Sequence, residues 1–217
     1  MDCTASMGPW IRQAKTRMVE IVETVRSQHP NTNILVGFVG YRDYGDDENQ
    51  IVIPFQIAQD TMNQIQPIQA EGGDDCAEDV AHALFRALHM DWSDADVKIV
   101  FHIADAPAHG MNFHDIHVSD RYPRGDPHGL DPRDSVERMS FLNMDFTFVK
   151  INETTDTMIE QFDNCYAQGG IFSVIDLCTQ GSRHRLIDRD EDPIVLHEAL
   201  SCAMTRSITN YISSQAL

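Results

Sequence analysis

The chain has 217 residues and is 42% hydrophobic, with only 12 Gly and 9 Pro, which is enough apolar sequence for the core of one globular domain spanning residues 1–217. The formal net charge is −18, and because such a surface repels the phosphates of nucleic acids, no nucleic-acid partner is expected. The acids fit a metal site or a basic partner surface, with an acidic, solvated exterior as the simpler alternative.

The cysteines are far apart and include no Cys-x-x-Cys pair, which is typical of reduced, mostly buried thiols in a cytoplasmic protein. They are Cys3, Cys76, Cys165, Cys178 and Cys202. No basic-then-apolar leader precedes Asp2, and no apolar run is long enough to cross a membrane, so no membrane span is expected.

The first half of the chain alternates helix and strand patterns. Apolar residues at helical spacing predict a helix over 9–28, and a run rich in β-branched and aromatic residues predicts a buried strand over 33–41. Residues 51–56 are predicted to form an antiparallel partner strand at an edge, because their proline cannot donate a ladder hydrogen bond. A weak helix over 61–69, interrupted by a proline, and a strong helix over 77–90 follow.

The second half continues the alternation around one long polar loop, 107–133, whose length indicates a functional loop or lid. The other predicted elements are a strand over 97–104, a short helix near 135–142, a strand over 145–151, a helix over 155–168, a strand over 171–177 and, after a polar loop at 180–192, a helix over 193–213. This order predicts an α/β fold with a doubly wound, mostly parallel sheet and helices on both faces.

The start of the chain places an acid and two hydroxyls at alternate positions: Asp2, Thr4 and Ser6. Mg²⁺ prefers oxygen ligands in octahedral geometry and keeps several waters, so these side chains are suitable ligands when a loop turns them toward one point. Such a site needs further carboxylates from elsewhere in the chain. The alternative interpretation is a helix N-cap, because Ser6 precedes Pro9 and an apolar-periodic run.

Two further acidic loops are predicted to lie at the same edge of the sheet. Asp105 ends a buried strand, and the loop at 72–78 comes directly before a helix N-terminus. Sites in open parallel sheets form at the carboxyl ends of the strands. Three separate loops therefore bring oxygen ligands to one edge, which predicts a divalent-metal site there.

With these motifs the chain resembles a von Willebrand factor type A (vWA) domain with a metal-ion-dependent adhesion site. The matching residues are Asp2-x-Thr4-x-Ser6, the loop at 72–79 (GGDDCAED) and the loop at 104–107 (ADAP). Within that superfamily the chain is most similar to the vWA domain of alpha-type protein kinases. The supporting segments are 37–43 (GFVGYRD), 72–80 (GGDDCAEDV), 102–110 (HIADAPAHG) and 122–127 (YPRGDP).

The resemblance implies a protein-binding module in which Mg²⁺, or Mn²⁺ or Ca²⁺, is held by the adhesion-site loops and completed by an Asp or Glu of a protein partner. The implied ligands are Asp2, Thr4, Ser6, Glu78 and Asp105, with Asp74 and Asp75 as runners-up. Glu78 is included because the common threonine of the second metal loop is replaced by acid in this chain. The alternative function is the regulatory or targeting portion of an alpha-type serine/threonine protein kinase.

The chain departs from this family at the centre of the sheet. Domains of this kind place an apolar strand directly before the Asp-x-Thr-x-Ser loop, and this chain has only Met1 there. We therefore expect either a shortened start or a sheet that lacks its first central strand. A buried strand contributes several large apolar contacts at roughly 1.5–3 kcal/mol each, so its loss threatens both the fold and the metal-site geometry.

The sequence also contains patterns that suggest two other kinds of chemistry. His114-x-x-His117, with Asp115 and Asp120 nearby, imitates a transition-metal or hydrolase site, and the competing interpretation is a polar surface loop. The Gly pairs at 72–73 and 169–170 lack the Lys and the spacing of a phosphate-binding loop. We therefore expect no phosphoryl transfer by this chain alone.

Overall fold

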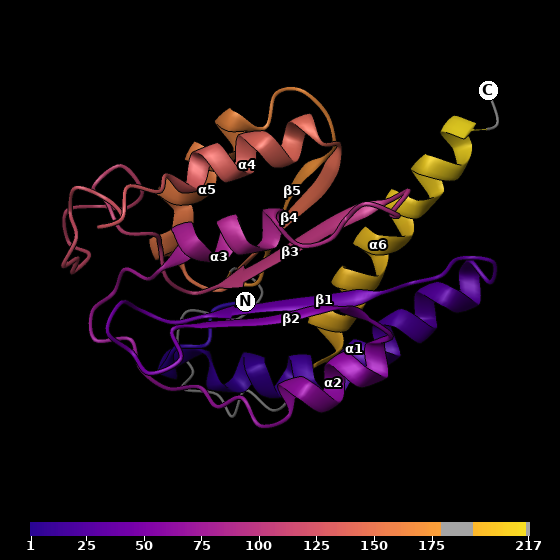
Figure 1. Cartoon of the computed structure of the whole chain (residues 1–217), viewed down its shortest axis with the longest axis horizontal. Coiled ribbons are helices and arrows are strands. Elements are labelled where there is room, and N and C mark those ends of the chain that lie inside the picture. Colours follow the sequence, from indigo (N-terminus) through magenta and orange to yellow (C-terminus); the bar gives the residue numbers. More distant parts are fainter. Residues whose placement is uncertain (179–192, 216–217) are drawn as a thin grey trace.

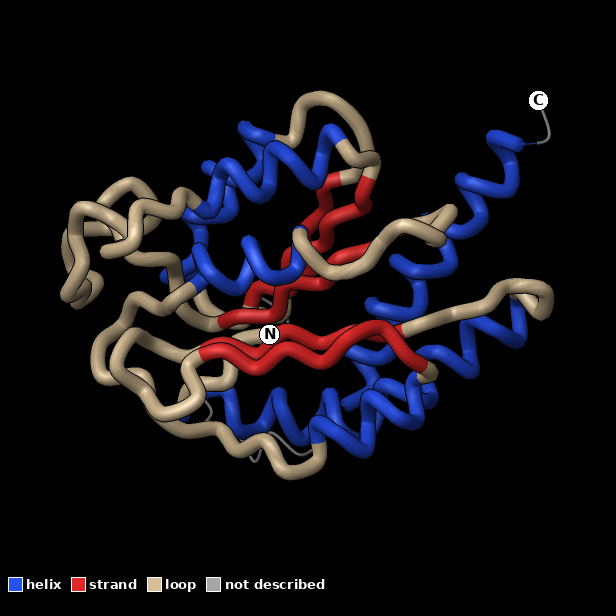
Figure 2. Tube along the Cα trace, viewed as in Figure 1, coloured by secondary structure: helices blue, strands red, loops and turns tan. Residues whose placement is uncertain are grey.

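In the computed structural model, which describes residues 1–178 and 193–215, the strands occupy the middle of the molecule and helices cover them on either side (Figures 1 and 2). The predicted polar loop at 180–192 therefore lies outside the described residues. No described helix is long and apolar enough to span a membrane.

The predicted order of helices and strands is confirmed. The elements are α1 (Gly8–Gln28), β1 (Val36–Tyr41), β2 (Gln50–Gln56), α2 (Ala58–Ile65), α3 (Val80–Leu88), β3 (Lys98–Ala104), α4 (Pro132–Phe141), β4 (Met144–Lys150), α5 (Asp156–Cys165), β5 (Phe172–Asp176) and α6 (Pro193–Gln215), with short 3-10 helices at Ala5–Met7 and Glu153–Thr155. Helix α2 begins earlier than predicted and ends before Pro67. Proline has no backbone N–H to donate, and its ring clashes with the carbonyl of the preceding turn, so it ends the helix.

The strands form two groups. β1 pairs with β2 antiparallel, while β3, β4 and β5 form a parallel sheet in that order. Residues 1–3 lie between the two groups: Asp2 forms a parallel bridge with Tyr41, and its backbone N–H donates to the carbonyl of Ile103 at 3.0 Å. Over the described residues the chain thus adopts the expected doubly wound α/β arrangement, in which residues 1–3 form a short connection between β1 and β3.

Apolar cores lie on both faces of the strands, because successive side chains of a strand point to opposite faces. Phe146 and Phe148 of β4 belong to the core under α3, α4 and α5. Val149 of the same strand belongs to the core under α1, α2 and α6, together with Ile103 of β3. The helices on both faces therefore bury an alternating set of strand side chains, as in a doubly wound fold.

We expect Phe148→Ala to destabilise the domain by about 3–5 kcal/mol, because the ring is fully buried and its loss leaves a cavity. The free energy of unfolding in urea measures this. Ile116→Ala is the control, since Ile116 is 82% exposed and its truncation should change stability by less than about 0.5 kcal/mol. Equal effects of the two substitutions would contradict the assignment of this core.

Candidate metal centre

The side chains of Asp2, Thr4 and Ser6 converge, as the spacing predicts. Asp2 is fully buried, and its Oδ1 accepts hydrogen bonds from the backbone N–H of Thr4 at 2.9 Å and from Thr4 Oγ1 at 2.7 Å. Thr4 Oγ1 lies 3.4 Å from Ser6 Oγ. The N-cap interpretation of Ser6 is wrong, because Met7 is the N-cap of α1 and makes no side-chain capping bond.

The loop at 72–78 packs directly against Thr4 and carries a buried Glu78. The backbone N–H of Glu78 donates to the carbonyl of Pro107 at 2.9 Å, which ties this loop to the loop after β3. Gly73 has φ +82°, and a Cβ there would lie 2.9 Å from Glu78 Oε1 and 3.1 Å from Thr4 Cβ. Only glycine allows this backbone conformation and this close approach.

Asp105 follows β3 and lies next to Asp2. Its charge contributes to the pKa of Asp2, and Thr154 Oγ1 donates to its backbone carbonyl at 2.9 Å. Over the described residues, however, the ligand atoms of Asp2, Glu78 and Asp105 do not all lie within 4.8 Å of one another. A Mg²⁺ ion shared by these loops would therefore bind some carboxylates through water, as Mg²⁺ commonly does.

The three acidic loops lie at the carboxyl ends of the strands, and we call this edge of the sheet the rim. The electrostatics of the rim favour a cation. Burial, followed by the charge of Asp105, raises the pKa of Asp2 to about 7. Burial, followed by four neighbouring carboxylates, raises the pKa of Glu78 to about 10; the carboxylates are those of Asp2, Asp43, Asp46 and Asp75. Within the described part of the chain, no hydrogen-bond donor reaches Asp2 Oδ2 or Glu78 Oε2, although both atoms are buried. The residues present therefore fit a small divalent cation.

The two runner-up ligands are held by an arginine of the long loop. Asp74 is exposed and pairs with the Arg121 guanidinium at 3.0 Å. Asp75 Oδ2 accepts a hydrogen bond from the backbone N–H of Arg121 at 2.6 Å. Arg121 thus occupies one oxygen of each acid, whereas Glu78 Oε1 lies beside Gly73, which packs against Thr4.

A buried chain of acids and histidines, of which the sequence pointed only to His114 and Asp120, lies beside the site. His109 Nε2 is 2.7 Å from Asp43 Oδ1, and His109 Nδ1 is 2.8 Å from Asp120 Oδ1. Asp120 Oδ2 is in turn 3.0 Å from His114 Nε2. Burial alone lowers the pKa of His109, but the hydrogen bonds with Asp43 and Asp120 outweigh it, and the net direction is upward. His109 is the ring that joins two carboxylates from separate loops.

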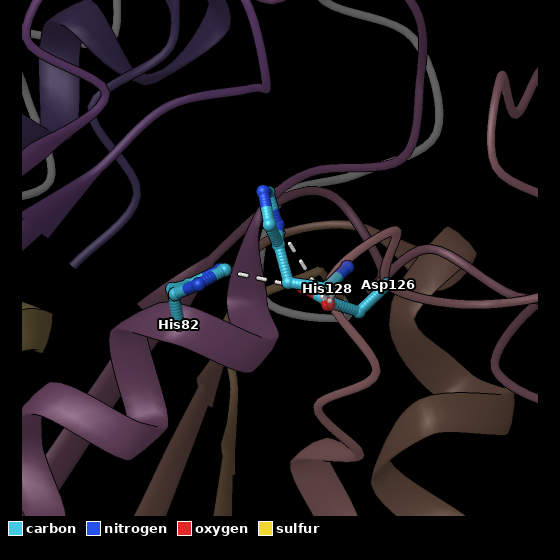
Figure 3. Close-up of side chains that lie close together, drawn as sticks. All are labelled: His82, Asp126 and His128. Carbon is cyan, nitrogen blue, oxygen red and sulfur yellow. Dashed lines mark hydrogen bonds and ion pairs between the residues drawn. The ribbon is translucent and has the colours of Figure 1, made fainter.

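A second cluster joins the long loop to α3 (Figure 3). His82 Nδ1 lies 3.3 Å from Asp126 Oδ2, and His128 Nδ1 lies 4.0 Å from Asp126 Oδ1. Tyr44 adds its hydroxyl, which hydrogen-bonds to Asp126 and, at 2.7 Å, to Asp79 Oδ1. Imidazole and carboxylate are ligands that also suit a transition metal.

The predicted His114-x-x-His117 group does not come together in this way. His114 is buried against Asp120, whereas His117 is exposed. The compact groups of three metal-ligating side chains among the described residues are His82, Asp126, His128 and Asp43, Asp75, His109. Neither of these groups includes His114 or His117.

A doubly wound sheet with acidic loops at one rim is the arrangement of a vWA domain. The profile of the von Willebrand factor A domain matches residues 1–119, and the chain belongs to this family. The chain is 35% identical over 167 residues to alpha-protein kinase vwkA of Dictyostelium discoideum, a match that covers 75% of this chain and 26% of that protein. The chain therefore spans about a quarter of that relative's length.

Solved structures with a similar fold include three adhesin or vWA proteins. The pilus adhesin SpaC from Lactobacillus rhamnosus GG, in its open conformation, matches with a TM-score of 0.59 at 13% identity, over 97% of this chain and 29% of that one. A von Willebrand factor type A protein from Catenulispora acidiphila matches with a TM-score of 0.54 at 16% identity, over 95% of this chain and 41% of that one. The SpRpn10 VWA domain matches with a TM-score of 0.52 at 11% identity, over 81% of this chain and 84% of that one. At these identities the likeness establishes the fold alone.

We expect Asp2→Asn to stabilise the metal-free chain at pH 8, by an amount on the order of 2 kcal/mol. The pKa of Asp2 is raised to about 7 in the fold, so the stability of the unchanged chain is full below the ordinary pKa near 4 and falls as pH rises toward 7. Asparagine removes this loss. Urea unfolding in the presence of EDTA at pH 5 and pH 8 measures the free energy of unfolding of each chain, with Asp91→Asn at an exposed position as the control. The free energy of unfolding of the variant minus that of the unchanged chain should be larger at pH 8 than at pH 5. A smaller difference at pH 8 would contradict the assignment.

His109→Gln should destabilise the chain by up to about 3 kcal/mol at pH 6, because Asp43 and Asp120 lose their shared cation. A raised pKa means that the contribution of His109 is complete below about 6.5 and is lost as pH rises through the folded-state pKa. The difference from the unchanged chain should therefore shrink as pH rises. The exposed His117→Gln serves as control, and a pH-independent difference would show that His109 is neutral in the fold.

Proposed function

We propose that this chain is a divalent-metal-dependent protein-binding module. Mg²⁺ is held by Asp2, Thr4, Ser6, Glu78 and Asp105, and a carboxylate from a protein partner completes its coordination. The observation that carries the proposal is the meeting of three loops around two buried carboxylate oxygens, Asp2 Oδ2 and Glu78 Oε2, for which the described residues supply no hydrogen-bond donor.

The residues have different parts in this scheme. Ser6 is exposed and Thr4 is buried, so Ser6 is the hydroxyl on the solvent side of the site. Glu78 and Asp2 supply buried negative charge when they are ionised, and a divalent cation offsets it; for Asp2 the Met1 ammonium already does so in part. Two neutral hydroxyls and water among the ligands keep residual positive charge on the ion, and the bound ion offers that charge to an anionic group of a partner. Mn²⁺ or Ca²⁺ are the alternatives to Mg²⁺.

The partner must overcome the charge of the chain itself. With 34 acidic and 16 basic residues, the chain repels an acidic partner outside the immediate site. We therefore propose that the partner presents its Asp or Glu within a partly basic surface, so that the acid meets the ion and the bases meet the acidic rim.

The test uses Mn²⁺, whose bound water relaxes solvent protons. We expect the chain to bind Mn²⁺ with enhanced relaxation, and a Lys-flanked peptide with one Asp to reduce that enhancement by displacing a bound water. The same peptide with Asn in place of Asp is the matched control. Asp2→Asn and Ser6→Ala should weaken Mn²⁺ binding at least tenfold, a loss of about 1.4 kcal/mol, while His117→Ala leaves it unchanged. The site assignment fails if His117→Ala has the larger effect, and the carboxylate proposal fails if the two peptides act alike.

The second candidate function is a regulatory or targeting portion of an alpha-type kinase. The sequence similarity to alpha-protein kinase vwkA favours it, and a metal-dependent binding module is a suitable targeting device. The two candidates are compatible if the module recruits a kinase substrate. A protein carrying this chain together with a kinase domain would decide for the second.

We expect no phosphoryl transfer from ATP by the purified 217-residue chain, because its Gly pairs lack the Lys of a phosphate-binding loop. Radiolabelled ATP with a generic acceptor protein measures this, with an active kinase as positive control. Activity that a substitution within the chain abolishes, such as Asp105→Asn, would overturn the expectation.

We also propose that residues 1–217 act as one module and that it works in the cytoplasm. Helix α6 packs on α1, with Thr205 Oγ1 donating to Gln28 Oε1 at 2.9 Å, which supports a single unit. The five free cysteines suit a reducing compartment.

A further inference from the structure

The cluster of His82, Asp126 and His128 brings together metal-ligating side chains from two separate segments of the chain. His82 lies in the first turn of α3, where the Asp79 N-cap accepts a hydrogen bond from its backbone N–H at 3.2 Å. Asp126 and His128 belong to the long loop between β3 and α4. In Figure 3 the His82 side chain projects from the helix toward the loop that carries the other two. One ligand atom of each residue lies within 4.8 Å of the others, so small side-chain movements bring all three to a single ion.

Asp126 is held in the orientation and the charge state that a metal ligand needs. Its carboxylate is buried, and Oδ1 accepts hydrogen bonds from the backbone N–H of His128 at 2.6 Å and of Leu130 at 3.1 Å. Oδ2 is thereby turned toward Tyr44 and His82. Burial raises the pKa of Asp126, but the hydrogen bonds from Tyr44 and from these two N–H groups outweigh it, and the net direction is downward. The side chain is therefore an ionised carboxylate at neutral pH, the form that binds metals.

The two imidazoles approach this carboxylate at distances that suit a shared ion better than direct hydrogen bonds. His82 Nδ1 is 3.3 Å from Asp126 Oδ2, and His128 Nδ1 is 4.0 Å from Asp126 Oδ1, which is beyond hydrogen-bond reach. Zn²⁺ binds nitrogen and carboxylate oxygen at about 2.0–2.2 Å in tetrahedral geometry, so neighbouring ligand atoms lie about 3.3–3.5 Å apart. Because the His128 side chain is 64% exposed, it is free to rotate by the small amount that closes the set around one ion.

The charges around the cluster also call for a cation. The Tyr44 hydroxyl has one hydrogen, yet it lies between the buried carboxylates of Asp79 and Asp126. Within the described part of the chain, these two carboxylates form ion pairs with His82 and His128, and no lysine or arginine pairs with them. Neutral imidazoles leave this buried negative charge uncompensated. A divalent cation compensates it.

We propose that His82, Asp126 and His128 form a transition-metal site that binds Zn²⁺ and fastens the long loop to α3. Two imidazoles and one carboxylate are ligands that suit Zn²⁺, whereas the all-oxygen site proposed at the rim suits Mg²⁺. Three protein ligands leave one tetrahedral position for a water. The bound ion joins the loop to the helix and so restricts the movement of the loop beside the rim. The inference does not rest on the proposed function, because none of its three ligands belongs to the rim site.

The test adds Zn²⁺ to the full, metal-stripped chain in excess Mg²⁺, which keeps the rim site filled. The chain carries Cys76→Ser and Cys202→Ser, because these exposed thiols are also Zn²⁺ ligands. Calorimetry should show a single bound Zn²⁺ per chain, and Zn²⁺ should shift the imidazole resonances of His82 and His128. His128→Ala should weaken Zn²⁺ binding by roughly tenfold or more, and the exposed position lets the variant keep its fold. His117→Ala, at another exposed position of the same loop, is the matched control.

A second variant tests whether the side chain at position 128 touches the ion. His128→Cys replaces the imidazole with a thiolate, which is also a Zn²⁺ ligand, and should restore the binding that His128→Ala loses. With Co²⁺ in place of Zn²⁺, this variant should gain a thiolate-to-cobalt charge-transfer band that His117→Cys lacks. The proposal is overturned if His128→Ala binds Zn²⁺ as tightly as the parent chain, or if the charge-transfer band is absent. It is also overturned if no Zn²⁺ binds while Mg²⁺ fills the rim site.

Discussion

The structure depends on how three residues, Met1 to Cys3, are held between two groups of strands. The N–H of Cys3 donates to the carbonyl of Tyr41 at 2.8 Å, and the N–H of Tyr41 donates to the carbonyl of Met1 at 3.2 Å. On the other side, the N–H of Asp2 donates to the carbonyl of Ile103 at 3.0 Å. These bonds connect β1 to β3 across the gap between the sheets. They also fix the backbone from which the Asp2 side chain leaves, so the geometry of the rim and the continuity of the sheet have the same origin.

Buried negative charge is concentrated at this rim, and that arrangement opposes folding. Asp2 and Glu78 are both nearly inaccessible to solvent, and each lies among further carboxylates. Ionised groups in such a place cost free energy unless a cation or a proton offsets them. A local conflict of this kind is expected at functional sites, where a ligand resolves what the folded chain alone leaves unfavourable.

The long loop between β3 and α4 is anchored at several points despite its length. His109 joins it to Asp43 of the loop after β1, and Asp126 joins it to His82 on α3 (Figure 3). Arg121 adds contacts with the acidic loop at 72–78. Since the loops of the candidate metal site are its neighbours, these contacts give the rim a fixed outline. A partner would thus meet a preformed surface there.

The sequence by itself determined the order of helices and strands, the doubly wound fold class and the three acidic loops, because these follow from local periodicity and from ligand chemistry. Only the tertiary structure decided which polar groups are buried together. His109 lies 66 residues from Asp43 in sequence, and Tyr44 lies 82 residues from Asp126. These pairings depend on how distant loops pack against one another, which local sequence patterns do not determine.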